Sequence, residues 1–148
     1  MKILVMNGPN LKLLGTREPE IYGSETLDDI IGKLTLWAAD KGVHIDAFQS
    51  DVEGELVAKI GGVGGLYDGI IINPAAYTHT SVALRDAIKT CGIPVVEVHL
   101  SNTHRRETFR HHSLTAGVCL GQVMGFGAHG YVMALEGLVQ AIISKKGS

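Results

Sequence analysis

Polar side chains able to bind an anion or move a proton gather after three short apolar runs of this 148-residue sequence. Arginine suits a carboxylate or phosphate, while asparagine and histidine hydrogen-bond to hydroxyl and carbonyl groups. The pattern therefore predicts acid–base chemistry on a small polar anion. The first set is Asn7, Asn10, Arg17 and Tyr22, the second is Asn73, Tyr77, Thr78 and His79, and the third is His99, Ser101, Asn102, His104, Arg105 and Arg106, with Arg110 nearby.

A base and an acid can be assigned within these sets. Arg17 and Tyr22 share one polar segment, so a guanidinium can lie beside the phenol. A phenol has an ordinary pKa of about 10, and a neighbouring positive charge favours the phenolate, by roughly 1–3 units if it behaves as carboxylates do. An imidazole changes charge near neutral pH, so His99 can serve as the acid.

Several other function classes are not supported by the sequence. No Gly-Lys-Ser/Thr follows an apolar run, and no Gly-x-Gly-x-x-Gly follows the first one. No pair of carboxylates stands with histidine at metal-ligand spacing, so we expect neither a metal nor a cofactor. Cys91 and Cys119 are far apart, which is typical of reduced thiols. The lysines fall mostly in predicted helices or at the termini; Lys12 is the exception, and nothing around it favours a Schiff base.

Net charge and hydropathy limit which classes of partner and which cell compartment we expect. The net charge is −2 with histidine neutral, which argues against a nucleic-acid partner. The apolar run at residues 1–6 is too short for a signal peptide or a membrane span, and no other run is long enough to cross a bilayer. We expect a cytoplasmic protein with no membrane association.

The elements that must position these side chains alternate along one predicted domain, residues 1–148. Apolar β-branched runs predict strands at residues 2–6, 43–49, 69–72, 93–99 and 118–124. Apolar residues at helical spacing predict helices at residues 27–38, 56–60, 81–90, 103–111 and 132–144. Thr26 and Asp29 fit a capping box at the start of the first helix, and Gly42 fits its end.

Five rounds of strand then helix predict an α/β fold. Buried runs between amphipathic helices are typical of a parallel sheet covered on both faces. We expect a flavodoxin-like, doubly wound, five-stranded sheet in three layers, α/β/α. Ligands of such sheets bind beyond the carboxyl ends of the strands. The three polar sets therefore converge at one edge of the sheet.

The same residues belong to motifs that resemble those of type II 3-dehydroquinate dehydratases. The resemblance runs in order along nearly the whole chain. Two departures stand out: Lys12, where many members have Asn, and Ala75 or Ala76, where many have Gly; alanine tolerates positive φ poorly, so we expect the loop after Asn73 to differ slightly. The matching segments are residues 8–11, 14–15, 17–19 and 22–23, then 72–74 and 78–87, then 97–102, 106–107 and 109–110, and finally 125–127 and 130–131.

The resemblance implies a flavodoxin-like fold and a carbon–oxygen lyase that uses no cofactor. Such a hydro-lyase converts 3-dehydroquinate reversibly to 3-dehydroshikimate by trans-elimination through an enolate. That step serves the shikimate pathway, which leads to chorismate and the aromatic amino acids, or the breakdown of quinate. The resemblance also implies a homododecamer built as a tetramer of trimers.

Residue roles are carried over from the resemblance. Tyr22 is the base that removes the C2 proton, Arg17 keeps it ionised, and His99 protonates the departing C1 hydroxyl. Asn10 holds a water on the enolate oxygen, and Glu97 orients His99. The implied substrate-binding residues are Asn73 with the amides of Leu100 and Ser101 at the carboxylate, His79 and Arg110 at the ring hydroxyls, and Asp86 from a neighbouring subunit.

Two other functions compatible with the fold remain as alternatives. A flavodoxin-type electron carrier would need a Ser/Thr-rich phosphate loop after the first strand, where this chain has residues 7–10, Asn-Gly-Pro-Asn. A signalling receiver domain would need a phosphorylatable Asp after the third strand, where Asn73 stands. Neither requirement is met.

Overall fold

The computed structural model describes residues 1–16, 18–22 and 24–146, with Tyr22 described by its backbone alone. The predictions for the side chains of Arg17 and Tyr22 lie outside this description. The strands are β1 (Lys2–Asn7), β2 (His44–Gln49), β3 (Gly69–Asn73), β4 (Val95–His99) and β5 (Gly121–Met124). The α-helices are α1 (Pro19–Tyr22), α2 (Leu27–Asp40), α3 (Glu53–Gly61), α4 (Val82–Thr90) and α5 (His129–Lys146).

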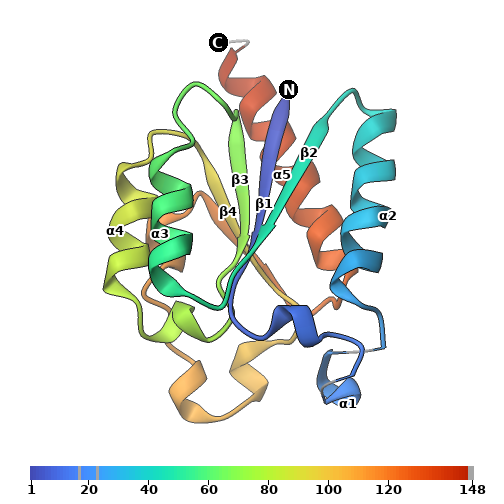
Figure 1. Ribbon diagram of the computed structural model, residues 1–148, viewed down its shortest axis with the longest axis vertical. Helices are drawn as coiled ribbons and strands as arrows, with labels where there is room; N and C mark the ends of the chain where they lie inside the picture. The colour runs from blue at the N-terminus through green and yellow to red at the C-terminus, as the bar shows by residue number, and fades with distance from the viewer. Residues whose placement is uncertain (17, 23, 147–148) are drawn as a thin grey trace.

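The strands form one parallel sheet in the order β2-β1-β3-β4-β5. This is the flavodoxin-like order, with its reversal between β1 and β3. Helices α3 and α4 cover one face of the sheet, and α2 and α5 cover the other (Figure 1). The predicted doubly wound, three-layer α/β fold is confirmed.

The sheet separates two apolar cores because successive side chains of a strand point to opposite faces. In β1, Ile3 and Val5 pack with the α2 and α5 side, whereas Leu4 and Met6 pack with the α3 and α4 side. All four of these side chains are fully buried. The continuous apolar runs of the sequence are thus explained by burial on both faces.

Helix ends follow the predicted capping chemistry. The Thr26 hydroxyl accepts from the Asp29 amide, and the Asp29 carboxylate accepts from the Thr26 amide, both at 3.1 Å. Gly42, just after α2, has a φ of +72°, a conformation that glycine adopts without strain. Ser81 caps the start of α4, because its hydroxyl accepts from the Leu84 amide.

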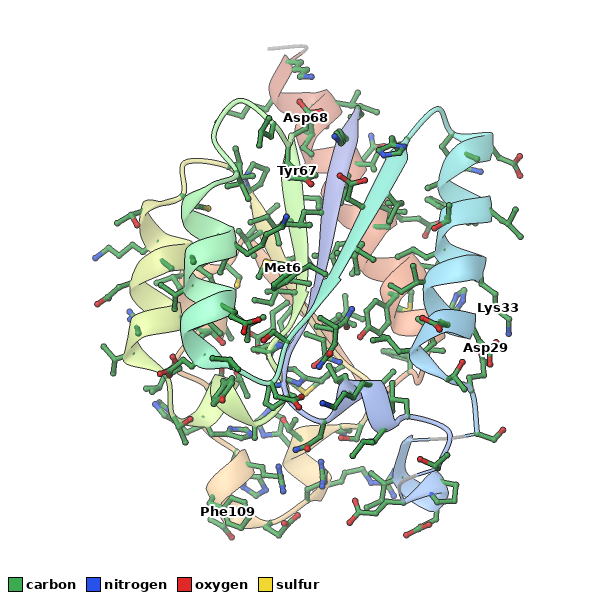
Figure 2. All side chains as sticks on the ribbon, viewed as in Figure 1. Met6, Asp29, Lys33, Tyr67, Asp68 and Phe109 are labelled. Atoms are coloured by element: carbon green, nitrogen blue, oxygen red, sulfur yellow. The ribbon has the colours of Figure 1, made fainter. Side chains whose placement is uncertain are left out.

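The helix predicted at residues 103–111 was wrong. The segment forms two short 3₁₀ turns, η3 (Thr103–Arg105) and η4 (Thr108–Arg110), separated by extended backbone at Arg106. Its one large apolar side chain, Phe109, is 66% exposed, and Figure 2 shows it at the end of the molecule opposite Tyr67 and Asp68. An isolated short helix without a buried face is not stable, because packing supplies most helical stability.

Several other boundaries differ from the predictions. Strand β4 starts at Val95 rather than at residue 93, because Pro94 has no amide to donate to a strand ladder. Strand β5 starts at Gly121, after a 3₁₀ turn η5 (Ala116–Val118) that occupies the predicted strand start. Helix α1 and the 3₁₀ turns η1 (Leu11–Leu13) and η2 (Ala75–His79) were not predicted.

The loops after β1 and β3 pack backbone against backbone. The Gly8 amide donates to the Asn73 carbonyl at 2.8 Å. A Cβ on Gly8 would lie 2.5 Å from the Pro74 carbonyl oxygen, so only glycine fits there. Ala75 has a φ of +52°, and its amide donates to the Asn73 side chain. The loop therefore holds an alanine in the positive-φ region that the sequence indicated as difficult for it.

A buried tyrosine braces the ends of β1 and β3. Tyr131 of α5 is fully buried and donates its hydroxyl to Asn7 Oδ1 at 2.6 Å. The same hydroxyl accepts from Asn73 Nδ2 at 3.0 Å. Burial raises the pKa of Tyr131 far above its ordinary value, which keeps the phenol neutral and able to donate. One phenol thus fixes the side chains of two neighbouring strand ends.

Replacing Ala75 by glycine should cost less stability than the same change at Ala76. Left-handed backbone costs a non-glycine residue about 1–2 kcal/mol, which offsets the roughly 0.5–1 kcal/mol that glycine loses in unfolded-chain entropy. We expect Ala75→Gly to be neutral or stabilising and Ala76→Gly to lose about 0.5–1 kcal/mol. Urea unfolding at one fixed protein concentration measures both. A larger loss of unfolding free energy for Ala75→Gly than for Ala76→Gly would show that the positive φ of Ala75 does not strain the backbone.

Removing the Tyr131 hydroxyl should destabilise the fold. Tyr131→Phe leaves the Asn7 and Asn73 amides without a shared partner, and an unpaired buried polar group costs about 1–3 kcal/mol. Tyr77→Phe is the matched control, because the Tyr77 hydroxyl donates to the Asp51 carbonyl from a half-buried position. Equal unfolding free energies for the two variants would argue against the brace.

Candidate active site

A pocket opens beyond the carboxyl ends of β1, β3 and β4, where the three polar sets were predicted to meet. Figure 1 shows α1 and the segment after β4 at this same end of the molecule. The structure brings seven predicted site residues to the pocket wall: Asn10, Asn73, His79, His99, Leu100, Ser101 and Arg110. The other lining residues are Pro9, Leu11, Leu14, Ala75, Ala76, Thr103 and Arg106.

His99 and Glu97 form a buried pair at the end of β4. The two residues are two apart on a strand, so their side chains share one face of the sheet. The distance from His99 Nε2 to Glu97 Oε2 is 2.6 Å. Glu97 has no exposed surface, while His99 is 7% exposed and reaches the pocket wall. The predicted contact between these two residues is therefore present.

Glu97 is held as a carboxylate. Burial by itself would raise its pKa, but the hydrogen bond and the charge of His99, with the hydroxyls of Thr115 and Thr78, hold the pKa below its usual range. An ionised carboxylate accepts hydrogen bonds and donates none. His99 Nε2 therefore carries the hydrogen of this bond, and Nδ1 is the nitrogen left for a ligand.

The residues of the second polar set are fixed by the turn after β3. His79 Nδ1 lies 2.7 Å from the carbonyl oxygen of His112, which leaves Nε2 for the pocket. Asn73 is 3% exposed and uses its oxygen on the Ala75 amide and one amide hydrogen on Tyr131. A primary amide has two donors, so the second Asn73 N–H remains for a bound molecule.

Two arginines bring positive charge to the pocket from the segment after β4. Arg110 was predicted, and its Nε lies 3.2 Å from Glu107 Oε2. Arg106 was not selected as a site residue, although it lines the pocket and lies 3.7 Å from Glu107 Oε1. Its place among several charged residues of residues 102–112 gave no sign of which ones point inward. Guanidinium groups suit an anionic ligand.

Asn10 is positioned by an unusual backbone and a side-chain anchor. Its φ is +68°, which asparagine tolerates better than most residues, and its amide donates to Asp51 Oδ1 at 3.0 Å. Lys12 Nζ lies 2.7 Å from Asp51 Oδ2. The Lys12 contact, followed by that with the Asn10 amide, lowers the pKa of Asp51 to about 2. Lys12 therefore anchors the loop through Asp51 and is not a lining residue of the pocket.

Among the described residues, Glu97 and Asp86 are the two predicted site residues that do not line the pocket of this single chain. The Arg17 and Tyr22 side chains lie outside the described residues. A second, open groove shares Leu100, Ser101 and Arg106 with the pocket and is also lined by Ile21, the residue before Tyr22. Asp86 lies on the exposed side of α4. Within the described residues of a single chain, Asp86 is therefore not part of the pocket wall.

Two observations concern metals and membranes. Across residues 1–16, 18–22 and 24–146, no three side chains of the types His, Cys, Asp and Glu gather closely enough to hold a metal ion. In the same described part of the chain, every helix is too short or too polar to cross a bilayer.

Known proteins resemble this chain along almost its whole length. A protein of Geotalea daltonii named 3-dehydroquinate dehydratase is 57% identical over 142 residues, which are 96% of this chain and 99% of that protein. A protein of the same name from Jannaschia sp. is 56% identical over 140 residues, or 95% of each chain. The relatives thus match in extent as well as in sequence.

Solved structures give the same result. A type II dehydroquinase from Butyrivibrio crossotus superposes with a TM-score of 0.92 at 45% identity, covering 94% of this chain and 97% of that one. A 3-dehydroquinate dehydratase-like protein from Bifidobacterium longum reaches a TM-score of 0.72 at 28% identity, covering 97% and 98%. A family model described as dehydroquinase class II matches residues 1–139. The chain therefore belongs to the class II dehydroquinase family.

Proposed function

We propose that this chain catalyses the reversible dehydration of 3-dehydroquinate to 3-dehydroshikimate. The observation that carries the proposal is the buried Glu97–His99 pair at the wall of a pocket that also presents Arg106 and Arg110. An acid beside positively charged guanidinium groups suits the elimination of water from a carboxylate-bearing substrate. The names of the similar dehydratases support the same reaction.

The reaction needs one base and one acid. The substrate proton at C2 is α to a ketone, and the hydroxyl at C1 is β to it. Removal of the C2 proton by the Tyr22 phenolate forms an enolate, and Arg17 stabilises the phenolate by its charge. The enolate then reforms the ketone and expels the C1 hydroxyl as the C1–O bond breaks.

His99 supplies the proton that turns the departing hydroxyl into water. His99 enters this step as an imidazolium, and the proton leaves from Nδ1 because Nε2 is held by Glu97. The cycle ends with a neutral imidazole, a protonated Tyr22, an enone and one water. A proton passing from Tyr22 to solvent and another returning to His99 restore the starting state, so the reaction needs no other reactant.

The other predicted residues bind and orient the substrate. The remaining N–H of Asn73 and the backbone amides of Leu100 and Ser101 hold the carboxylate. The 3₁₀ turn after them is only three residues long, so these amides act singly and not as a helix N-terminus. His79 and Arg110 bind ring hydroxyls. Asn10 holds a water on the enolate oxygen, where negative charge develops.

We further propose that the working enzyme is a cytoplasmic homododecamer, a tetramer of trimers. Asp86 is exposed on α4 and away from the pocket of its own chain. In the assembly it would complete the pocket of a neighbouring chain. The reaction would serve the shikimate pathway toward aromatic amino acids or the breakdown of quinate, since both contain this step.

Ultraviolet absorbance tests the proposed reaction. The product is a conjugated enone and absorbs where 3-dehydroquinate does not. We expect a steady rise on mixing substrate with the purified protein, unchanged by a chelator and by borohydride added with substrate, which would trap a Schiff base. No rise from folded protein would refute the proposed activity. A loss of activity with borohydride would refute the mechanism.

Tyr22→Phe and His99→Ala should each lose most turnover while the fold is kept. A positioned acid or base contributes roughly 10²–10⁴-fold to a rate, so we expect kcat to fall by about that factor in each variant. Tyr67→Phe and His44→Ala are matched controls, because both residues bond to Asp46 beyond the pocket. Circular dichroism verifies folding. If either site variant turned over substrate at nearly the rate of the unchanged protein, the role assigned to that residue would be refuted.

A further inference from the structure

Three hydroxyl groups lie around the Glu97 carboxylate, from residues that do not line the pocket. Thr78 Oγ1 donates to Glu97 Oε2 at 2.8 Å, and Thr115 Oγ1 donates to Glu97 Oε1. Ser113 Oγ lies 2.5 Å from Thr78 Oγ1. Gln122 Nε2, from β5, donates to Oε2 at 3.1 Å. Thr78 and Thr115 are at most 1% exposed, so the carboxylate receives protein donors in place of water.

The direction of these hydrogen bonds follows from the number of protons. A hydroxyl has one proton to donate, and the threonine protons are used on Glu97. We infer that Ser113 donates to Thr78, because the Thr78 proton is used on Glu97 and the other acceptors near Ser113 Oγ, Thr115 Oγ1 and Glu97 Oε2, lie farther away at 3.4 and 3.5 Å. Ser113 Oγ itself accepts from the amides of Thr115 and Ala116 at 3.2 and 2.9 Å. A directed chain of hydrogen bonds therefore runs from the Ala116 amide through Ser113 and Thr78 to Glu97.

The same hydroxyls connect the pocket loops. Thr78 precedes His79 in η2, and its carbonyl accepts from the Leu114 amide at 2.6 Å. Ser113 follows His112, whose carbonyl contacts His79. The hydroxyls that contact Glu97 therefore belong to the same two segments that position His79 in the pocket wall. The hydroxyls themselves do not line the pocket.

We propose that Thr78 and Thr115 are positioning residues that hold Glu97 so that His99 keeps its hydrogen on Nε2 and reacts through Nδ1. This inference rests on the proposed role of His99 as the acid. The hydroxyls occupy the acceptor sites of Glu97 that His99 does not use, so the carboxylate has one orientation toward the imidazole. Without one hydroxyl the carboxylate can turn, and the second tautomer of His99 becomes accessible.

Thr115→Val keeps the shape of the side chain and removes the hydroxyl. We expect kcat to fall about tenfold, a part of the roughly 10²–10⁴-fold that a positioned acid contributes, with KM changed less than twofold. Thr115→Ser restores the hydroxyl and should restore kcat. Thr35→Val is the matched control, because Thr35 is exposed on α2 and bonds only to its own helix at Ile31.

Solid-state ¹⁵N NMR of histidine-labelled protein reads the tautomer without reference to activity. The His99 signals are identified by their loss in His99→Asn. Near neutral pH we expect protonated Nε2 and a bare Nδ1 in the neutral imidazole, and a mixture of tautomers in Thr115→Val that Thr115→Ser reverses. Thr78→Val and Thr78→Ser give the same test from the other oxygen of Glu97.

The outcomes separate this inference from the proposed reaction. A hydrogen on Nδ1 of the neutral imidazole in the unchanged protein would overturn the positioning role and needs no variant. A folded Thr115→Val with an unchanged tautomer and kcat within twofold would overturn it as well. Full turnover by His99→Ala would instead overturn the acid role of His99, while the tautomer of the unchanged protein would still test the hydroxyls.

Discussion

Glu97 places a carboxylate in the β4 strand with no exposure to solvent, and much of the site follows from how that charge is satisfied. A buried charge is costly unless it is paired and hydrogen-bonded. The donors are His99, which lines the pocket, the hydroxyls of Thr78 and Thr115, and Gln122 from β5. The carboxylate thereby joins segments distant in sequence, and the imidazole that it holds lines the pocket.

On the other side of the pocket, the ends of β1 and β3 are joined by close packing and neutral hydrogen bonds. Gly8 lets the loop after β1 touch the loop after β3, and Tyr131 links the strand ends through Asn7 and Asn73. These contacts fix the orientation of the Asn73 side chain, which lines the pocket. The pocket thus combines one wall fixed by the neutral hydroxyl of Tyr131 with another fixed by the buried carboxylate of Glu97. Preorganised groups of this kind stabilise developing charge without rearranging during the reaction.

Features of the fold that depend on neighbouring residues in the sequence were predicted correctly. Burial of β1 on both faces and the capping box of Thr26 and Asp29 were readable from the sequence because each depends on neighbouring residues. The helix expected at residues 103–111 failed, since spacing alone does not show that Phe109 has nothing to pack against. The convergence of Asn10, Asn73, His79 and His99 was predictable from strand ends and was confirmed. The donors Thr115 and Gln122 were missed because they lie near Glu97 only once β5 pairs with β4, which spacing along the chain does not show. The roles of Tyr22, Arg17 and Asp86 remain predictions.

A double-mutant cycle on kcat most directly tests whether Glu97 acts through His99. The four proteins are the unchanged chain, Glu97→Gln, His99→Asn and the double variant, each verified as folded. Residues that act as one unit have non-additive effects. The account predicts that Glu97→Gln lowers kcat strongly by itself and changes it little in the His99→Asn background. Equal fold-losses in both backgrounds would show that Glu97 contributes independently of His99 and would contradict the account.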